Sequence, residues 1–303
     1  MANVSLEPMP VSHLFIALFV VAIWAFNFVA IKVALVDFPP ILMAAIRFAL
    51  AAVPFVFFIR RPAAPFRLVA FYGLLVFALQ FGLVFLGMAL GVSASLAAIG
   101  LQLTVFVTIG LAAIIHGERV SRVQLAGAAV AVAGLAIIAA NAGGDVSLPG
   151  FVCVLLGACC WGAGNLVGKA MGKVDMVALV VWSSLVAPLP LAALSLLVEG
   201  PDRIGHALSG VSWPAAASMA YIVYASTHIG YSAWAWLMAR HPASTVAPFS
   251  LLVPPLAAVF SAAVLGESFP AWKLVAGSLV LAGVLINLFG GRIVASLRPA
   301  RSA

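Results

Sequence analysis

Long runs of hydrophobic residues, separated by short polar segments, dominate the chain. A helix that crosses the hydrocarbon core of a bilayer needs about 20 consecutive apolar residues. Ten runs approach that length, and each is continuous where the strands of a membrane barrel would alternate apolar and polar residues. They cover residues 12–34, 39–59, 66–89, 92–115, 121–141, 149–170, 175–198, 212–238, 242–265 and 271–290. The pattern predicts an all-α polytopic membrane protein with ten transmembrane helices.

The composition agrees with a chain whose main solvent is lipid. Of the 303 residues, 65% are hydrophobic and 8% are charged, whereas soluble domains average roughly 45 to 50% apolar and about 25% charged residues. These polar side chains are too few to cover a water-soluble fold of this size. The three cysteines, Cys153, Cys159 and Cys160, share one apolar run, so we expect neither a disulfide framework nor a zinc site.

The positions of the basic residues predict the orientation in the membrane. With the N-terminus in the cytoplasm, eleven of the 15 Lys and Arg residues fall on the inner side. Lys32, Arg203 and Lys273 fall on the outer side, and Arg47 lies within the second run. Because short cytoplasmic loops carry an excess of Lys and Arg, both termini are predicted to be cytoplasmic. Basic residues spread over many short loops also exclude a nucleic-acid interface, which would gather them on one surface.

Short motifs recur between the two halves of the chain. Trp24 and Lys32 close the first run, and Trp161 and Lys169 close the sixth with the same spacing of eight residues. Gly-Glu pairs after the fourth and ninth runs are followed by Leu and Gly at equal distances, namely Gly117, Glu118, Leu125 and Gly134, and Gly266, Glu267, Leu274 and Gly283. Because each unit has five spans, an odd number, its second copy must enter from the opposite face. We predict inverted repeats at 12–141 and 149–290 around a central cavity.

These features together resemble the EamA-type drug/metabolite transporters. The resemblance rests on the two five-helix halves, the Gly-Glu pairs, and Trp24, Asn27, Arg47, Phe48, Trp161 and Asn165. Within that family the chain is similar to bacterial inner-membrane exporters of amino acids. The resemblance implies a basket of helices around a cavity and efflux of small metabolites. One departure is Ala25, where the family commonly has Gly, as the second half has at Gly162.

Polar and aromatic residues inside the runs are candidates for lining a substrate cavity. The eighth run carries Tyr221, Tyr224, His228 and Tyr231 at three- and four-residue steps, which place them on one face of a regular α-helix. Amphipathic aromatics suit a cavity for amino acids, although hydrogen bonds between helices would also explain such a face. The other candidates are Trp24, Asn27, Gln80, Gln102, Trp161 and Asn165.

Arg47 is the one basic residue predicted to lie inside the membrane. It lies about eight residues into the second run, at a depth where a cation costs at least ~2.5 to 3.5 kcal/mol. Two roles would offset this cost. The guanidinium could meet a substrate carboxylate or a gating carbonyl, or it could form a structural pair with carbonyls at a helix end.

Prolines punctuate the second half at Pro188, Pro248, Pro254 and Pro255. A proline removes a backbone donor and bends its helix. Kinks at membrane depth persist only against protein or a water-filled cavity. These four prolines are therefore predicted hinges for alternating access.

All eight acidic residues map to loops or to the ends of runs. Carriers coupled to protons or sodium usually keep a carboxylate within the membrane, so we predict uncoupled, gradient-driven transport. Glu118 and Glu267 are instead expected to cap the helices that follow them. No cofactor and no metal site is expected.

The sequence thus favours export of amino acids and related small metabolites. The alternative within transporters is export of hydrophobic drugs or other metabolites, with proton coupling. An intramembrane enzyme is a different class, which would need clustered carboxylates for metal and phosphate, and the sequence has no such cluster. We expect a small-molecule substrate and the lipid bilayer as partners. The identity of the substrate and the oligomeric state stay open.

Overall fold

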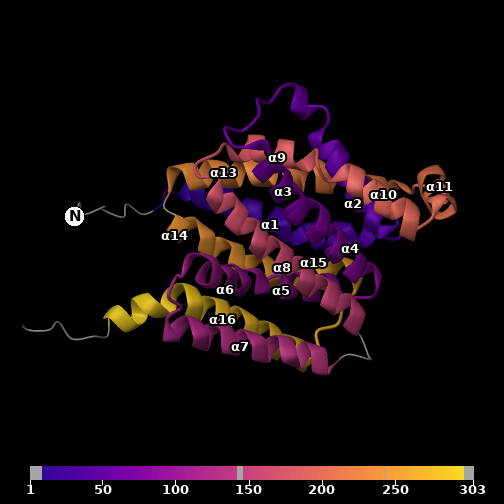
Figure 1. Cartoon of the computed structure of the whole chain (residues 1–303). Helices are drawn as coiled ribbons and strands as arrows, with labels where there is room; N and C mark the ends of the chain where they lie inside the picture. The colour runs from indigo at the N-terminus through magenta and orange to yellow at the C-terminus, as the bar shows by residue number, and fades with distance from the viewer. Residues whose placement is uncertain (1–8, 142–145, 242, 297–303) are drawn as a thin grey trace, which may run out of the picture.

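The computed structural model describes residues 9–141, 146–241 and 243–296. Throughout these three segments the regular secondary structure is helical, without strands (Figure 1). Nine of the described helices are long and apolar enough to cross a membrane. The prediction of an all-α chain with many membrane-spanning segments is therefore confirmed.

The helices follow one another with short connections. Those of the first half are α1 (Val11–Ala34), α2 (Pro40–Ala52), η1 (Phe55–Phe57), α3 (Phe66–Tyr72), η2 (Gly73–Leu79), α4 (Gln80–Ala89), α5 (Ala94–Gly100), α6 (Leu103–His116) and α7 (Arg122–Ala140). Those of the second half are α8 (Leu148–Ala170), α9 (Met176–Ser184), α10 (Pro188–Val198), α11 (Pro201–Ser209), α12 (Trp213–Ala220), η3 (Tyr221–Ile229), α13 (Gly230–Arg240), α14 (Ala243–Val246), η4 (Ala247–Leu252), α15 (Val253–Leu265) and α16 (Ala271–Ser296).

The predicted eighth span is helical but is not one of the nine. α12, η3 and α13 follow one another without interruption from Trp213 to Arg240. Ser, Thr, Tyr and His side chains lower the mean hydropathy of this stretch below that of the other spans. A helix with so many polar groups needs protein neighbours to satisfy them inside a membrane.

Irregular turns fall at corresponding places in the two halves. The third span contains the π-helical η2 and the eighth contains the π-helical η3. The fourth span breaks between α5 and α6, and the ninth changes from the 3₁₀-helical η4 to α15. π-helical turns are often found at functional sites, and discontinuous helices form the binding sites of many transporters.

The predicted hinge prolines stand at helix starts and breaks. Pro188 is the first residue of α10, after a break in the seventh span at 185–187. Pro254 and Pro255 lie in the first turn of α15, and Pro248 lies in η4. Backbone N–H groups in the first turn of a helix have no acceptor within that helix, so a proline there removes no hydrogen bond. These prolines therefore begin helices and do not kink continuous ones.

The two halves pack on each other through reciprocal contacts. α1 packs against α12, η3, α13 and α15, and α8 packs against α4, η2, α3 and α6. α2 contacts α9 and α10, and α7 lies along α16 at the lower edge of Figure 1. Exchange of the halves turns these four contacts of α1 into the four named contacts of α8.

Glycines allow α7 and α16 to approach closely. A Cβ atom added to Gly127 would lie 2.6 Å from the carbonyl oxygen of Gly283, and one added to Gly283 would meet the Gly127 oxygen. Close backbone approach at small residues is a common way to pack helices in lipid, where apolar burial does not drive association.

The repeated Gly-Glu motif has a structural cause. Gly117 and Gly266 end α6 and α15 with φ of 67° in both, a left-handed conformation that glycine adopts without penalty. Glu267 then accepts hydrogen bonds from the N–H of Ala94 at 2.7 Å and the hydroxyl of Ser95 at 2.8 Å. It thus caps α5 of the other half, which corrects the expectation that it caps the helix after it.

Candidate substrate-binding site

Arg47 is buried in the described structure, with 1% of its surface exposed. Its Nη2 donates to the hydroxyl of Thr227 at 3.2 Å, and among the described residues its Nε and Nη1 have no hydrogen-bond partner. The guanidinium carbon lies 4.0 Å from the ring centroid of Phe81 and 5.1 Å from that of Phe48. Aromatic faces attract the cation, but they leave its N–H groups without acceptors.

The start of α2 is held by a carboxylate from the second half. α2 begins with Pro40, whose missing N–H is not needed there. The next two N–H groups, of Ile41 and Leu42, donate to the two carboxylate oxygens of Glu199 at 2.8 and 2.9 Å. Ser195 donates to the same carboxylate at 2.6 Å. This cap fixes the helix that carries Arg47.

Aromatic side chains connect α1 to η3 and α13. The indole N–H of Trp24 donates to the Ser226 carbonyl at 3.2 Å, and the Tyr221 hydroxyl donates to the Ile23 carbonyl at 2.9 Å. The rings of Trp24 and Tyr231 lie 5.5 Å apart. These bonds join helices from opposite halves of the chain.

The predicted polar face of the eighth span is divided in the structure. Tyr221 and Tyr231 contact α1, whereas the His228 ring lies 4.0 Å from that of Phe55 and stacks on Tyr224, which is 46% exposed. The π-helical turn explains the division. Its i→i+5 hydrogen bonds widen the helix, so residues at three- and four-residue steps no longer share a face.

Side-chain hydrogen bonds join the fourth and sixth spans. The amide of Asn165 donates to the hydroxyl of Thr108 at 3.1 Å, and Thr104 donates to the carbonyl of Ala158 at 2.7 Å. Trp161 is half-buried and packs against the main hydrophobic core. These contacts tie α6 to α8.

Two further candidates are buried amide side chains whose oxygen atoms accept no hydrogen bond in the described structure. Asn27 on α1 is 7% exposed and Gln80 on α4 is 3% exposed. In the described part of the chain, neither Asn27 Oδ1 nor Gln80 Oε1 has a hydrogen-bond partner. Gln102 is half-buried at the break before α6. Buried polar atoms without partners are uncommon, and each calls for an explanation.

Thr227 and Phe81 contact the guanidinium of Arg47, and Trp24 and Tyr231 contact each other on α1 and α13, which pack against η3. We name these five residues the Arg47 cluster: Trp24, Arg47, Phe81, Thr227 and Tyr231. The sequence singled out Trp24, Arg47 and Tyr231 but not Thr227 or Phe81. Thr227 directly precedes His228, and it lies three residues after Tyr224 and four before Tyr231, so the same three- and four-residue spacing could have identified it. No sequence signal identifies Phe81.

No described carboxylate pairs with Arg47. Asp37, Glu118, Asp175, Glu199, Asp202 and Glu267 lie in loops or at helix ends, and Glu7 and Asp145 lie outside the described residues. An ion pair of 2.6 Å joins Lys169 to Glu118, with both side chains more than half exposed. Exposed pairs of this kind stabilise a protein by only about 0 to 1 kcal/mol.

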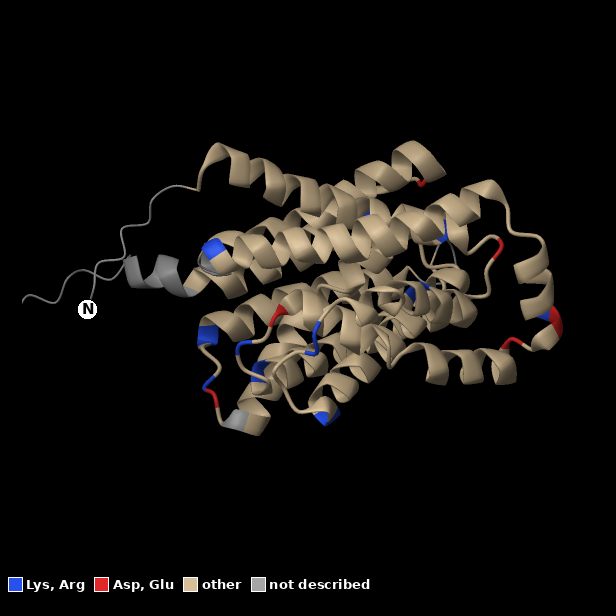
Figure 2. Ribbon diagram, turned by 90° about the horizontal axis from the view of Figure 1, so that it is seen from above, with Lys and Arg blue, Asp and Glu red and all other residues tan. Residues whose placement is uncertain are grey.

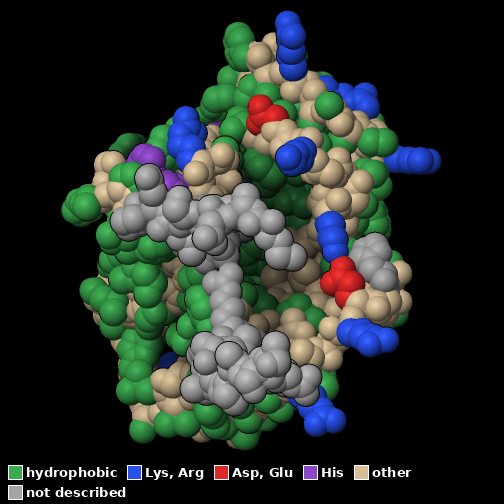
Figure 3. All heavy atoms as spheres, turned by 90° about the vertical axis from the view of Figure 1, so that its left-hand side faces the viewer, with side chains coloured by type: hydrophobic (Ala, Val, Ile, Leu, Met, Phe, Trp, Pro, Cys, Tyr) green, Lys and Arg blue, Asp and Glu red, His purple; other side chains and the backbone are tan. Residues whose placement is uncertain are grey.

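The ends of the molecule differ in charge. Figure 2 shows most Lys and Arg residues at the end where the N-terminus lies, and Asp and Glu at both ends. Figure 3 looks onto that first end, where the surface recedes beside the basic side chains and hydrophobic side chains form the floor.

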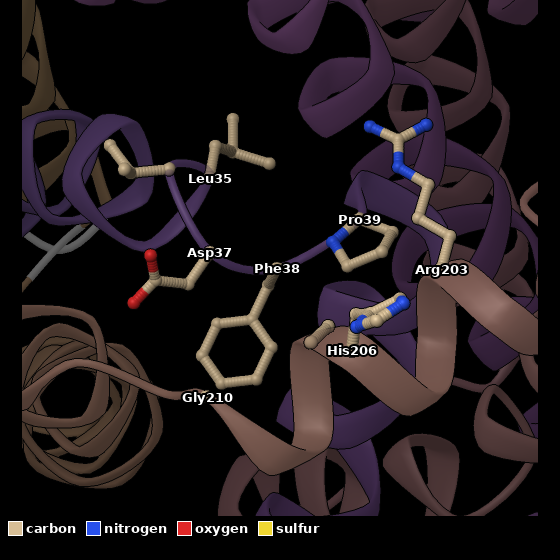
Figure 4. Close-up of a pocket in the computed structure, with 9 residues that line it drawn as sticks. Leu35, Asp37, Phe38, Pro39, Arg203, His206 and Gly210 are labelled. Atoms are coloured by element: carbon tan, nitrogen blue, oxygen red, sulfur yellow. The ribbon is translucent and has the colours of Figure 1, made fainter.

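A shallow pocket of about 250 Å³ opens at the other end, between α11 and the connection from α1 to α2 (Figure 4). Asp37, Arg203 and His206 line it, and it contains none of the predicted cavity residues. Hydrogen bonds from the hydroxyl and the backbone N–H of Ser212 lower the pKa of Asp37. That carboxylate is thus already engaged in joining the α1–α2 connection to the start of α12.

The fold and the buried polar cluster define a polytopic membrane protein of the transporter class. The EamA-like transporter family matches residues 11–140 and 148–289, and the chain belongs to this family. A solved structure with 16% sequence identity has the same fold, with a TM-score of 0.62 over 94% of this chain and 99% of the other.

Relatives with a described activity are similar over nearly the whole chain. A "Probable amino-acid metabolite efflux pump" of Salmonella typhimurium is 39% identical, covering 92% of this chain and 95% of the relative. A protein of the same description from Escherichia coli K12 is 35% identical, covering 91% and 95%. A "Probable terminal-alkyne amino-acid exporter" of Streptantibioticus cattleyicolor is 32% identical over 58% of each chain.

Proposed function

We propose that this protein exports amino acids and related small metabolites across the bacterial inner membrane by alternating access. The observation that carries the proposal is the 39% identity, over 92% of the chain, to a relative described as an amino-acid metabolite efflux pump. The matched family and these relatives are transporters. Buried amides, aromatics and a guanidinium between the halves suit a small polar substrate.

We further propose ten transmembrane spans arranged as two inverted repeats. The reciprocal packing of α1 and α8, and the π-helical turns η2 and η3 in the third and eighth spans, support this arrangement. In such transporters one repeat rocks against the other around a site between them. The proposed hinges are the breaks before α6 and α10 and the change from η4 to α15, with Pro188, Pro248, Pro254 and Pro255.

Transport is proposed to be uncoupled and driven by the substrate gradient. The six described acidic residues all lie outside the apolar parts of the spans. Proton- or sodium-coupled carriers generally place an ionisable carboxylate within the membrane. This distribution supports passive exchange.

Counterflow in proteoliposomes tests the function. The purified protein is reconstituted, and each radiolabelled common L-amino acid is offered outside vesicles loaded with the same unlabelled compound. We expect transient accumulation of at least one amino acid above protein-free vesicles, unchanged by a protonophore. Without accumulation of any amino acid, the proposed function fails; accumulation that a protonophore alters would instead overturn the uncoupled mechanism.

A further inference from the structure

We propose that Arg47 is the anchor for the substrate carboxylate, which makes a free carboxylate the feature that every substrate must carry. The inference rests on the proposed function and assigns a substrate class to the same site. It depends on three observations. The buried guanidinium of Arg47 has N–H groups without acceptors, and its one described hydrogen bond goes to the neutral hydroxyl of Thr227 in a π-helical turn. Amide oxygens on neighbouring helices are buried without donors.

The guanidinium of Arg47 has hydrogen-bond donors without acceptors in the described structure. Its five N–H groups make it a ligand for carboxylates, yet in the described structure Nε and Nη1 are buried without acceptors. The aromatic rings of Phe81, Phe48 and Phe85 lie within 5.8 Å of the guanidinium carbon and give it an apolar surround. A structural pair with helix-end carbonyls would have filled these donors, but the one hydrogen bond described for Arg47 goes to a hydroxyl.

In the described structure, Thr227 is the hydrogen-bond partner of the Arg47 guanidinium. Its hydroxyl accepts from Arg47 Nη2 at 3.2 Å and donates to the carbonyl of Ile222, five residues earlier, at 2.9 Å. The hydroxyl thus connects the cation to the widened turn of η3. A charged acceptor binds a guanidinium more strongly than a neutral hydroxyl does. A carboxylate that reaches Arg47 therefore displaces Thr227 and releases its hold on η3.

Acceptors for an ammonium group lie on the helices beside this cation. Asn27 Oδ1 on α1 and Gln80 Oε1 on α4 are buried and unfilled in the described structure. α1 packs against η3, and α4 packs against α2. Gln80 is also adjacent in sequence to Phe81, whose ring covers the guanidinium. Together the groups provide donors for one end of an α-amino acid and acceptors for the other.

The test compares ligands that differ only in the carboxylate. L-Alanine, L-alaninamide and ethylamine compete as unlabelled compounds in the counterflow assay, and the same series is made for each amino acid found to be carried. Loss of a charge-assisted hydrogen-bond pair corresponds to about a tenfold or larger change in affinity. For the wild type we expect the amide and the amine to compete at least about tenfold more weakly than the acid.

Variants then assign this selectivity to Arg47. Arg47→Gln is expected to raise KM about tenfold or more and to abolish the preference for the acid, and Arg47→Lys to retain part of it. Thr227→Val removes the resident partner, so KM should stay equal or fall. Arg61→Gln, an exposed arginine of the connection after α2, is the matched control and should behave as the wild type. Folding is checked by size-exclusion chromatography and melting temperature.

Each outcome bears on one proposal. Absence of all amino-acid counterflow overturns the proposed function. Two results would overturn the role of Arg47 as the carboxylate anchor and leave the proposed export function intact. One is equal competition by the amide and the acid, and the other is a folded Arg47→Gln variant that keeps the preference for the acid. If neither Arg47 variant folds, the wild-type series and Thr227→Val decide, because a rise in KM for Thr227→Val contradicts displacement by substrate.

Discussion

Glu199 shows how a single side chain at a membrane surface can organise a buried site. Both of its carboxylate oxygens accept N–H groups at the first turn of α2, the helix that carries Arg47. Helix N-termini leave backbone donors without partners, and a carboxylate there also interacts favourably with the helix dipole. The position of Arg47 in the membrane is thus set partly by a residue at the end of α10.

Replacement of Glu199 should therefore destabilise the protein. Glu199→Ala leaves the N–H groups of Ile41 and Leu42 and the Ser195 hydroxyl without this acceptor, which we expect to cost about 1 to 3 kcal/mol. Glu199→Gln keeps one acceptor oxygen and should cost less. Thermal melting in detergent measures both, with Asp202→Asn on the exposed face of α11 as control. Equal melting temperatures for Glu199→Ala and the control would contradict the capping role.

At the scale of the helix, the elements around the candidate site differ from those of a regular helix bundle because they contain irregular turns. η2 and η3 carry the π-helical turns, and breaks precede α6 and α10. A discontinuous helix exposes backbone groups that must be satisfied by protein or by water lining a cavity. η3 contacts α1 and α2, and η2 contacts α8 and α9, so both π-helical turns lie where the two halves of the chain meet.

Two helix glycines provide a matched test of close packing. Gly127 of α7 faces the backbone of α16, whereas an added Cβ at Gly110 of α6 would meet no described atom within 4 Å. Alanine improves helix propensity by roughly 0.5 to 1 kcal/mol over glycine. We expect Gly110→Ala to melt at or above the wild-type temperature and Gly127→Ala to melt lower, because the α7–α16 contact must open. An unchanged melting temperature for Gly127→Ala would argue against this close approach.

At the scale of the whole molecule, charge is distributed unevenly between the two ends (Figure 2). Eight of the eleven basic residues predicted to lie inside have described side chains: Arg60, Arg61, Arg67, Arg119, Arg122, Lys169, Lys173 and Arg240. The side chains of the other three, Arg292, Arg298 and Arg301, lie outside the described part. From the positive-inside rule we therefore predict that both termini lie in the cytoplasm.

Cysteine labelling tests this orientation. In a chain whose Cys153, Cys159 and Cys160 are replaced by Ala, Arg203→Cys and Arg61→Cys introduce single thiols at exposed positions that are predicted to lie on opposite sides of the membrane. A membrane-impermeant maleimide added to intact cells should modify residue 203 and not residue 61, and both should react after lysis. The reverse pattern would place the termini outside.

The hydrophobic pattern located the spans closely, and the prediction of 12–34 against the observed Val11–Ala34 is representative. The predicted span 212–238 is helical, but only the structure revealed its π-helical turn. No proline or glycine inside 221–229 announces that turn. The division of its polar face therefore could not be inferred from a period of three to four residues.

The sequence by itself determined where the chain crosses the lipid, its family and the presence of one cation inside the membrane. These properties depend on local composition and on motif spacing. Only the tertiary structure decided which polar atoms meet that cation, because Arg47 and Thr227 are separated by 180 residues and come together through packing of the two halves. Partners in a membrane interior are chosen by which helix faces touch, and the backbone geometry of η3 sets the face that carries Thr227.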